Sequence, residues 1–164
     1  MKQGKLIVFE GIDGAGTETQ SKLLFNYLKE RKKPVERVVY PDKKGAVGKL
    51  IYGRLRGDYE LPVQIQFLLH LVDFAKDQEK IRDWLKQGKI VIADRYFTST
   101  LAYQGAKGFP LNKALLAAKT FELAKPDLVI FLRVSSTTST KRKYKEKRNL
   151  DLHEKNKKFL KQAA

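Results

Sequence analysis

Four short apolar runs alternate with segments of helical spacing, and this alternation restricts the fold more than any other feature of the sequence. The runs are dense in Val and Ile and are bounded by turn residues or charges; they cover residues 6–9, 35–40, 90–93 and 128–134. Apolar residues within each run do not alternate strictly with polar ones. The pattern therefore predicts strands that are covered on both faces of a parallel sheet.

Between these runs, apolar residues recur at the spacing of an amphipathic helix in residues 21–31, 61–87 and 111–124. The segment 61–87 is predicted to be one long helix that ends at Gly88. Strands that alternate with helices favour an α/β fold, a doubly wound parallel sheet flanked by helices. With no internal repeat or flexible linker, residues 1–164 are expected to form a single domain.

The composition excludes several classes of protein. The absence of cysteine excludes a disulfide framework and a thiol nucleophile. The apolar share of 42% against 32% charged residues fits neither a membrane protein nor a disordered chain, and no apolar run is long enough to span a bilayer. The apolar run that ends before Glu10 is too short for a secretory signal, so we expect a cytoplasmic protein that does not associate with a membrane.

The net charge of +16 indicates an anionic partner. Residues 141–164 hold ten basic and three acidic residues, so part of this excess belongs to the end of the sequence. A nucleotide and a nucleic acid are both compatible with such a charge.

A glycine-rich segment follows the first predicted strand and precedes the first predicted helix. Such a segment lets successive backbone N–H groups face one anion, and the following helix adds its positive N-terminal end. The segment is predicted to bind the phosphates of a nucleotide through Gly11, Ile12, Asp13, Gly14, Ala15, Gly16, Thr17, Glu18, Thr19 and Gln20.

The loop departs from the phosphate-binding P-loop pattern at two positions. The spacing from Gly11 to Gly16 fits, but the Lys expected next is Thr17 and the following Ser or Thr is Glu18. Thr19 is the candidate hydroxyl for a magnesium ion, one position late. The competing interpretation is a plain glycine turn followed by an acidic first helical turn, which the helix dipole favours in any protein.

Four motifs in the same order make the sequence similar to the thymidylate kinase family, P-loop nucleoside monophosphate kinases. They are the segment 9–16, Tyr40-Pro41-Asp42-Lys43, Asp94-Arg95-Tyr96 with Ser99, Tyr103, Gln104 and Gly105, and the segment 125–130. The resemblance implies phosphoryl transfer from ATP to dTMP with Mg²⁺, a step of dTTP biosynthesis. It also implies a homodimer, formed through helices such as the one predicted over 61–87. Family members usually continue beyond the position of Leu160 through another strand and a final helix, which this sequence does not include.

The resemblance also assigns roles to residues near the predicted phosphate loop. Arg95 would grip the acceptor phosphate through its planar fork, and Asp94 would hold Mg²⁺ through water. Asp13 would approach the acceptor ribose, and Lys43 would replace the family's phosphate-binding Arg. The structural alternative for Asp94 and Arg95 is a salt bridge at the end of the strand. The structural alternative for Lys43 is an ordinary solvated lysine.

The acceptor base is less well defined by the motifs. The family's Phe that stacks on thymine aligns with His70, and the Arg that follows it aligns with Phe74. A core or surface His and a core Phe are the simpler interpretations, although both positions remain candidate base contacts. Ser99, Tyr103 and Gln104 are the remaining candidates to recognise a pyrimidine edge.

A basic lid segment is expected over residues 135–149. By the resemblance, Arg142 and Arg148 are its candidate catalytic cations, because phosphoryl transfer is favoured by cations that stabilise the negative charge of the transferring group. The alternative functions are a catalytically weakened nucleotide-binding relative, suggested by Thr17 and Glu18, and a nucleic-acid-binding protein that uses the basic tail. The kinase is favoured over the first alternative, and nucleic-acid binding comes last.

Overall fold

A parallel four-stranded sheet lies at the centre of the protein. The structure is a computed structural model that describes residues 3–135, 137–139 and 142. The strands are β1 (Lys5–Glu10), β2 (Val35–Val39), β3 (Ile90–Asp94) and β4 (Leu128–Phe131), in the order β2-β3-β1-β4. All three strand pairs are parallel, which confirms the predicted doubly wound α/β fold.

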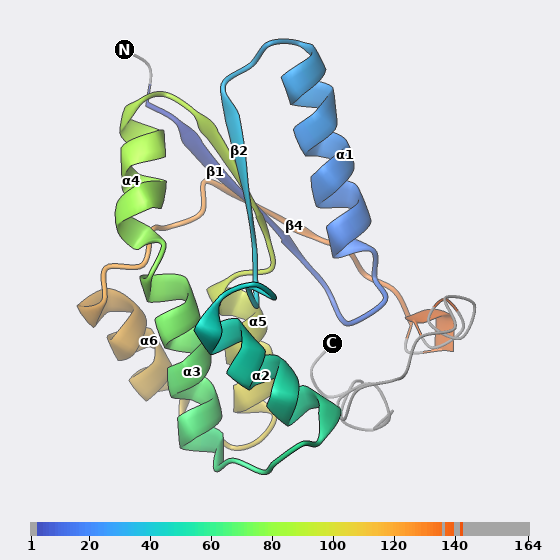
Figure 1. Cartoon of the computed structure of the whole chain (residues 1–164), viewed down its shortest axis with the longest axis vertical. Helices are drawn as coiled ribbons and strands as arrows, with labels where there is room; N and C mark the ends of the chain where they lie inside the picture. Colours follow the sequence, from blue (N-terminus) through green and yellow to red (C-terminus); the bar gives the residue numbers. More distant parts are fainter. Residues whose placement is uncertain (1–2, 136, 140–141, 143–164) are drawn as a thin grey trace.

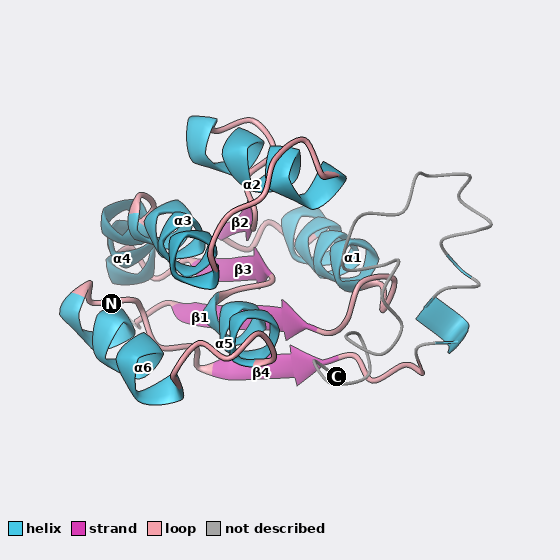
Figure 2. Cartoon of the chain, turned by 90° about the horizontal axis from the view of Figure 1, so that it is seen from below, coloured by secondary structure: helices cyan, strands magenta, loops and turns pink. Residues whose placement is uncertain are grey.

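The helices lie on both sides of this sheet and at its carboxyl edge. Helix α1 packs on one side, and α4 packs on the other (Figures 1 and 2). Helices α2 and α5 lie near the carboxyl ends of the strands. The bounds are α1 Thr17–Glu30, α2 Ala46–Arg56, α3 Val63–Ala75, α4 Gln78–Lys86, α5 Phe97–Gly105 and α6 Leu111–Thr120.

The core joins the inner strands to α3 and α5. Leu6, Val8, Val91 and Ala93 are fully buried in β1 and β3. A cluster of aromatic rings continues this core toward the carboxyl edge, with ring centroids 4.9 to 6.3 Å apart; its members are Tyr40, Phe74, Tyr96 and Phe97. Packed aromatic rings of this kind hold the loops after β2 and β3 in fixed positions.

The helix predicted over 61–87 is two helices, so that prediction is wrong. Helix α3 ends at Ala75 and α4 begins at Gln78. Two donors replace the regular helical bond to the Phe74 carbonyl: the Asp77 N–H at 3.2 Å and the Gln78 side-chain Nε2 at 2.8 Å. Because Phe74 O is taken by these groups, the i to i+4 ladder stops there, and the apolar periodicity alone gave no sign of the break.

The structure also differs from the prediction in the length and burial of β4 and in the number of helices. The strand predicted over 128–134 ends at Phe131, and the side chains of Leu128, Val129 and Phe131 are about half exposed, because none of the described residues covers them as β1 and β3 are covered. Helices α2 and α5 were not predicted from periodicity.

No helix in the described part of the chain has the length and apolar character to cross a bilayer.

Candidate functional site

The glycine-rich segment forms a tight loop between β1 and α1. Gly14 and Gly16 have φ values of 79° and 98°, in the left-handed region that favours glycine. The Ala15 N–H closes a turn on Ile12 O at 2.9 Å, and α1 begins directly at Thr17. The loop therefore brings the positive N-terminal end of α1 to the carboxyl edge of the sheet, as the sequence predicts for a phosphate site.

Asp94 and Arg95 leave β3 next to this loop. Asp94 pairs in register with Phe9 of β1 and with Val39 of β2, at the centre of the carboxyl edge. Arg95 has a φ of 63°, which is uncommon for a residue with a side chain. This is the edge where doubly wound sheets bind ligands, at the point where the chain continues to opposite sides of β1.

Arg95 holds the phosphate loop from one side. Its Nη1 donates to Gly11 O at 2.7 Å and to Ser99 Oγ at 3.2 Å, and its Nη2 donates to Asp13 Oδ1 at 2.7 Å. The Tyr103 hydroxyl donates to Asp13 Oδ2 at 3.1 Å. Burial lowers the pKa of Arg95, but Asp13, Tyr103, Glu10 and Asp94 together outweigh this effect and raise the pKa above its ordinary value. The predicted residues Asp13, Arg95, Ser99 and Tyr103 are thus one connected group.

Asp94 lies almost fully buried beside the first turn of α1. Its carboxylate forms an ion pair with Arg37, Nη2 to Oδ2 at 2.9 Å, and the Thr17 side chain lies near enough to lower its pKa. Burial raises the pKa of Asp94, while Thr17, Arg37 and Arg95 act in the opposite direction. A buried carboxylate needs such partners to remain ionised.

A cleft of about 1020 Å³ opens at this edge of the sheet. Six of its lining residues were not predicted, and they extend the cleft along α1 and toward α2: Lys22, Leu23, Asn26, Val39, Tyr40 and Tyr52. The predicted residues that line it are Asp13, Gly14, Ala15, Gly16, Thr17, Glu18, Thr19, Gln20, Lys43, Asp94, Arg95 and Arg142. Gly11 and Ile12 lie in the same loop but are buried beneath the surface of the cleft.

The candidate base contacts lie outside this lining. Phe74 is 2% exposed and belongs to the aromatic core, as the simpler interpretation has it. His70 lies against a separate small cavity with Arg54 and Gln66, and burial together with nearby cations lowers its pKa to about 4. Gln104 is 1% exposed, and its Oε1 has no hydrogen-bond partner in the part of the chain that the structure describes.

The lid segment is described only in part. Arg142 Nη1 donates to Ala15 O at 3.2 Å and to Gly14 O at 3.4 Å, so it reaches the phosphate loop. The Ser139 hydroxyl donates to Asp13 O. The predicted cation Arg148 and most of the lid segment 135–149 lie outside the described residues.

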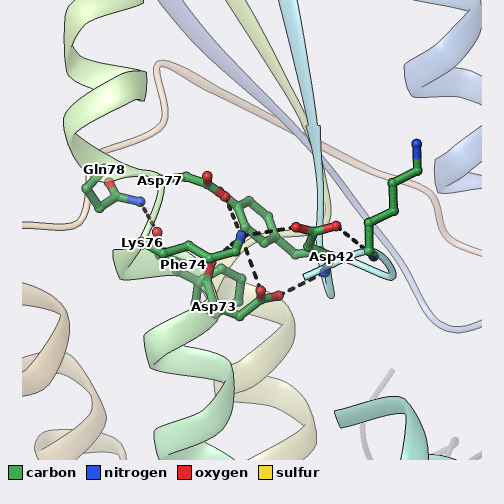
Figure 3. A network of polar contacts seen from close by, with 8 residues as sticks. Asp42, Asp73, Phe74, Lys76, Asp77 and Gln78 are labelled. Atoms are coloured by element: carbon green, nitrogen blue, oxygen red, sulfur yellow. Dashed lines mark hydrogen bonds and ion pairs between the residues drawn. The ribbon is translucent and has the colours of Figure 1, made fainter. Parts of the chain in front are cut away.

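The loop that carries Lys43 is fixed by a network of carboxylates around Lys76 (Figure 3). Lys76 Nζ lies 2.6 Å from Asp77 Oδ2, 3.2 Å from Asp73 Oδ1 and 3.6 Å from Asp42 Oδ2. Asp73 also accepts the Asp42 N–H at 3.0 Å. Burial raises the pKa of Asp73, whereas Asp42 has a lowered pKa because it accepts the Lys44 N–H. The network ties the loop after β2 to the α3–α4 break.

Three polar residues of the site were missed by sequence reasoning. Glu10 accepts the Ser99 N–H at 3.1 Å and the Tyr96 N–H at 3.0 Å, and so binds the start of α5. Arg37 and Lys76 make the ion pairs described above. For Arg37 there was a signal, since a basic side chain in a run predicted to be covered on both faces needs an acidic partner.

The donor set at the cleft fits a magnesium ion that is shared with a phosphate. No group of three or more His, Cys, Asp or Glu side chains suited to a metal occurs within residues 3–135, 137–139 and 142. Mg²⁺ commonly takes only one or two carboxylates together with substrate phosphates and water. Asp94 and Thr19, the donors expected from the sequence, both line the cleft.

The strand order, the glycine loop before α1 and the acid–base pair after β3 together define a P-loop nucleotide-binding fold. Comparison with solved structures agrees. A thymidylate kinase from Candida albicans superposes with a TM-score of 0.77 at 27% identity, over 98% of this chain and 75% of that one. For a thymidylate kinase from Ehrlichia chaffeensis the TM-score is 0.72 at 29% identity, over 85% of this chain and 78% of the other.

The chain belongs to the thymidylate kinase family, whose model matches residues 9–164. It is 35% identical over 133 residues to a thymidylate kinase of Plasmodium falciparum, covering 81% of this chain and 63% of that protein. It is 41% identical over 145 residues to a probable thymidylate kinase of Thermococcus onnurineus, covering 83% of this chain and 69% of that protein. The chain thus spans just under two thirds of the length of the Plasmodium relative.

Proposed function

We propose that this protein transfers the terminal phosphoryl group of ATP to dTMP, with Mg²⁺ bound to the phosphates. The observation that carries the proposal is the convergence of the glycine loop, Arg95 and Asp94 on one cleft at the carboxyl edge of the sheet. The family membership supports the same substrates.

The roles proposed for the side chains follow from their positions. The backbone N–H groups of the loop and the start of α1 bind the donor phosphates. Arg95 binds the acceptor phosphate, and Asp13 keeps the guanidinium in place through the 2.7 Å ion pair. Lys43 and Arg142 both line the cleft and add positive charge to it. The metal would supply charge neutralisation between the phosphates, held by Asp94 and Thr19.

The reaction itself is a direct displacement. An oxygen of the acceptor phosphate attacks the γ-phosphorus, and the bond from that phosphorus to the bridging oxygen of ADP breaks. The protein contributes alignment and positive charge rather than a covalent intermediate. The base contacts proposed for His70, Ser99, Tyr103 and Gln104 would select the acceptor, whereas Phe74 belongs to the core.

The test is a coupled assay of ADP release with purified protein, ATP, Mg²⁺ and each of the four deoxynucleoside monophosphates in turn. We expect turnover that is fastest with dTMP. Binding of ATP by calorimetry without product from any acceptor would contradict the proposal and leave a non-catalytic nucleotide-binding relative. Salt-sensitive binding of DNA without nucleotide binding would instead point to the nucleic-acid alternative.

We also propose a homodimer formed through α3, and a cytoplasmic location. Ile65, Leu68 and Val72 lie on one face of α3 and are 41 to 49% exposed, which supports α3 as the contact helix. The location rests on the cysteine-free composition and on the family.

A further inference from the structure

Arg37 lies in the middle of β2, and its guanidinium lies under the first turn of α1. Its Nε and Nη2 donate to Ser21 Oγ at 3.1 and 2.9 Å, and Nη2 also lies 2.9 Å from Asp94 Oδ2. The side chains of Arg37 and Asp94 are 18% and 4% exposed, and Ser21 is fully buried. An ion pair in such a position is desolvated, so each charge depends strongly on the other.

Residue 17 faces the same carboxylate. Thr17 is 7% exposed, and its side chain lies near enough to Asp94 to lower the pKa of that carboxyl. The P-loop pattern places a Lys at this position, whose ammonium would reach the vicinity of Asp94. In this chain Thr17 brings no charge to that carboxylate, and Arg37 reaches it from β2 instead.

Asp94 also lines the cleft, whereas Arg37 is not among the lining residues. Without its ion pair, the Asp94 carboxylate would place an unbalanced negative charge beside the donor phosphates. The guanidinium also fixes Ser21, whose hydroxyl donates to Glu18 O at 3.1 Å, and so holds the first turn of α1 against the sheet. That turn carries the N–H groups that face the phosphates.

We propose that Arg37 is a positioning residue that takes over the charge-balancing role of the missing P-loop lysine. It acts through Asp94 and the first turn of α1, not by touching the nucleotide. The proposal rests on the proposed function only in that the cleft binds a nucleoside triphosphate.

The first experiment measures ATP affinity by calorimetry, in EDTA and again with Mg²⁺, for the parent protein and for Arg37→Gln. We expect the affinity of Arg37→Gln in EDTA to fall roughly tenfold or more, because a buried carboxylate then repels the phosphates. The matched control is Lys89→Gln, which breaks the 2.8 Å pair with Glu36 next to Arg37 but does not touch the cleft. Its affinity should stay within about twofold of the parent.

The second experiment tests the replacement directly by adding Thr17→Lys to both backgrounds. In Arg37→Gln the new lysine should restore ATP affinity to within about threefold of the parent, and in the parent it should change affinity by less than that, because interacting sites are not additive. An equal gain in both backgrounds would overturn the proposal. So would an Arg37→Gln protein with a lowered melting temperature and unchanged ATP affinity, since that result describes a purely structural residue.

Two milder variants keep the test decisive if Arg37→Gln does not fold. Arg37→Lys keeps the positive charge but loses the planar guanidinium, and Ser21→Ala removes the hydroxyl that accepts the hydrogen bonds of Arg37. Both should weaken ATP binding while the protein stays folded by circular dichroism, and parent-like affinity in both would refute the role. If the parent binds ATP but forms no product, the proposed kinase activity fails, and the binding measurements still decide the role of Arg37.

Discussion

At the scale of single residues, the site depends on side chains that hold other side chains. Arg95 reaches Gly11 O, Ser99 Oγ and Asp13 Oδ1 at once, which requires the planar guanidinium and the unusual backbone conformation at this position. A flexible ammonium cannot satisfy these three acceptors in the same geometry. The substitution Arg95→Lys therefore keeps the positive charge at this position but removes the planar guanidinium.

We expect Arg95→Lys to lower kcat/KM for the acceptor roughly 30-fold, which corresponds to about 2 kcal/mol of lost charge-assisted hydrogen bonding. The KM for ATP should change less than about threefold, because the loop and α1 bind the donor. Steady-state kinetics with each substrate varied in turn measure the difference. Arg56→Lys is the control, since Arg56 pairs with Asp58 on the exposed surface. Equal effects on both substrates would contradict the assignment of Arg95 to the acceptor.

His70 gives a second prediction at this scale, because burial lowers its pKa from 6.5 to about 4. A lowered pKa means that the neutral form stabilises the fold above pH 6.5 and that this contribution is lost as the pH falls through 4. Between pH 7 and pH 4 the loss amounts to about 3 kcal/mol at most. Arg54 lies beside the same small cavity, so protonation of His70 would also meet a like charge.

The variant His70→Gln cannot take up a proton and should lose this part of the pH dependence. Urea unfolding at pH 7, 5.5 and 4 gives the free energy of unfolding of both proteins. We expect the difference between the parent and His70→Gln to shrink or reverse toward pH 4. Parallel curves over the whole range would show that His70 is not held neutral by the fold.

The sequence indicated most of the phosphate site, but not the residues that support it. The spacing of Gly11, Gly14 and Gly16 is a local signal, so the loop and its position before α1 could be predicted directly. The pair between Arg37 and Asp94 joins residues 57 positions apart, and only the strand register brings them together. A basic side chain in a run predicted to be covered on both faces signalled a partner without identifying it.

At the scale of elements, the strands were easier to predict than the helix boundaries. Strands of a parallel sheet show as short apolar runs, and all four were located, although β4 is about half exposed. The break between α3 and α4 was missed because apolar periodicity continues across it. What ends α3 is polar: Gln78 binds the Phe74 carbonyl, and Lys76 and Asp77 join the carboxylate network of Figure 3.

This break supplies a prediction at the scale of elements. Lys76→Met keeps the length and apolar contacts of the side chain but removes the cation that three carboxylates share. Asp73 is fully buried, so it would be left without its ion pair. We expect the free energy of unfolding to fall by about 2 kcal/mol, below the cost of breaking a fully buried pair because Lys76 is partly exposed.

Urea unfolding at pH 7 measures this loss. Lys86→Met is the matched control, because Lys86 forms an exposed pair with Asp83 at 3.8 Å on the neighbouring helix. Its free energy of unfolding should stay within about 0.5 kcal/mol of the parent. If both variants lose the same stability, the network around Lys76 does not fasten the loop after β2 to the helices.

At the scale of the whole molecule, the α3 face that carries Ile65, Leu68 and Val72 is the surface through which we expect two copies to associate. An isologous contact places the same helix of each copy against the other, so one substitution acts twice in the interface. Leu68→Glu would place two carboxylates in that apolar contact and should convert a dimer of 18.8 kDa chains into monomers. Light scattering coupled to size-exclusion chromatography measures the mass.

Leu116→Glu is the matched control, because Leu116 of α6 is equally apolar and 64% exposed. If Leu116→Glu dissociates the protein and Leu68→Glu does not, the contact involves α6, and a monomeric parent would refute the dimer itself.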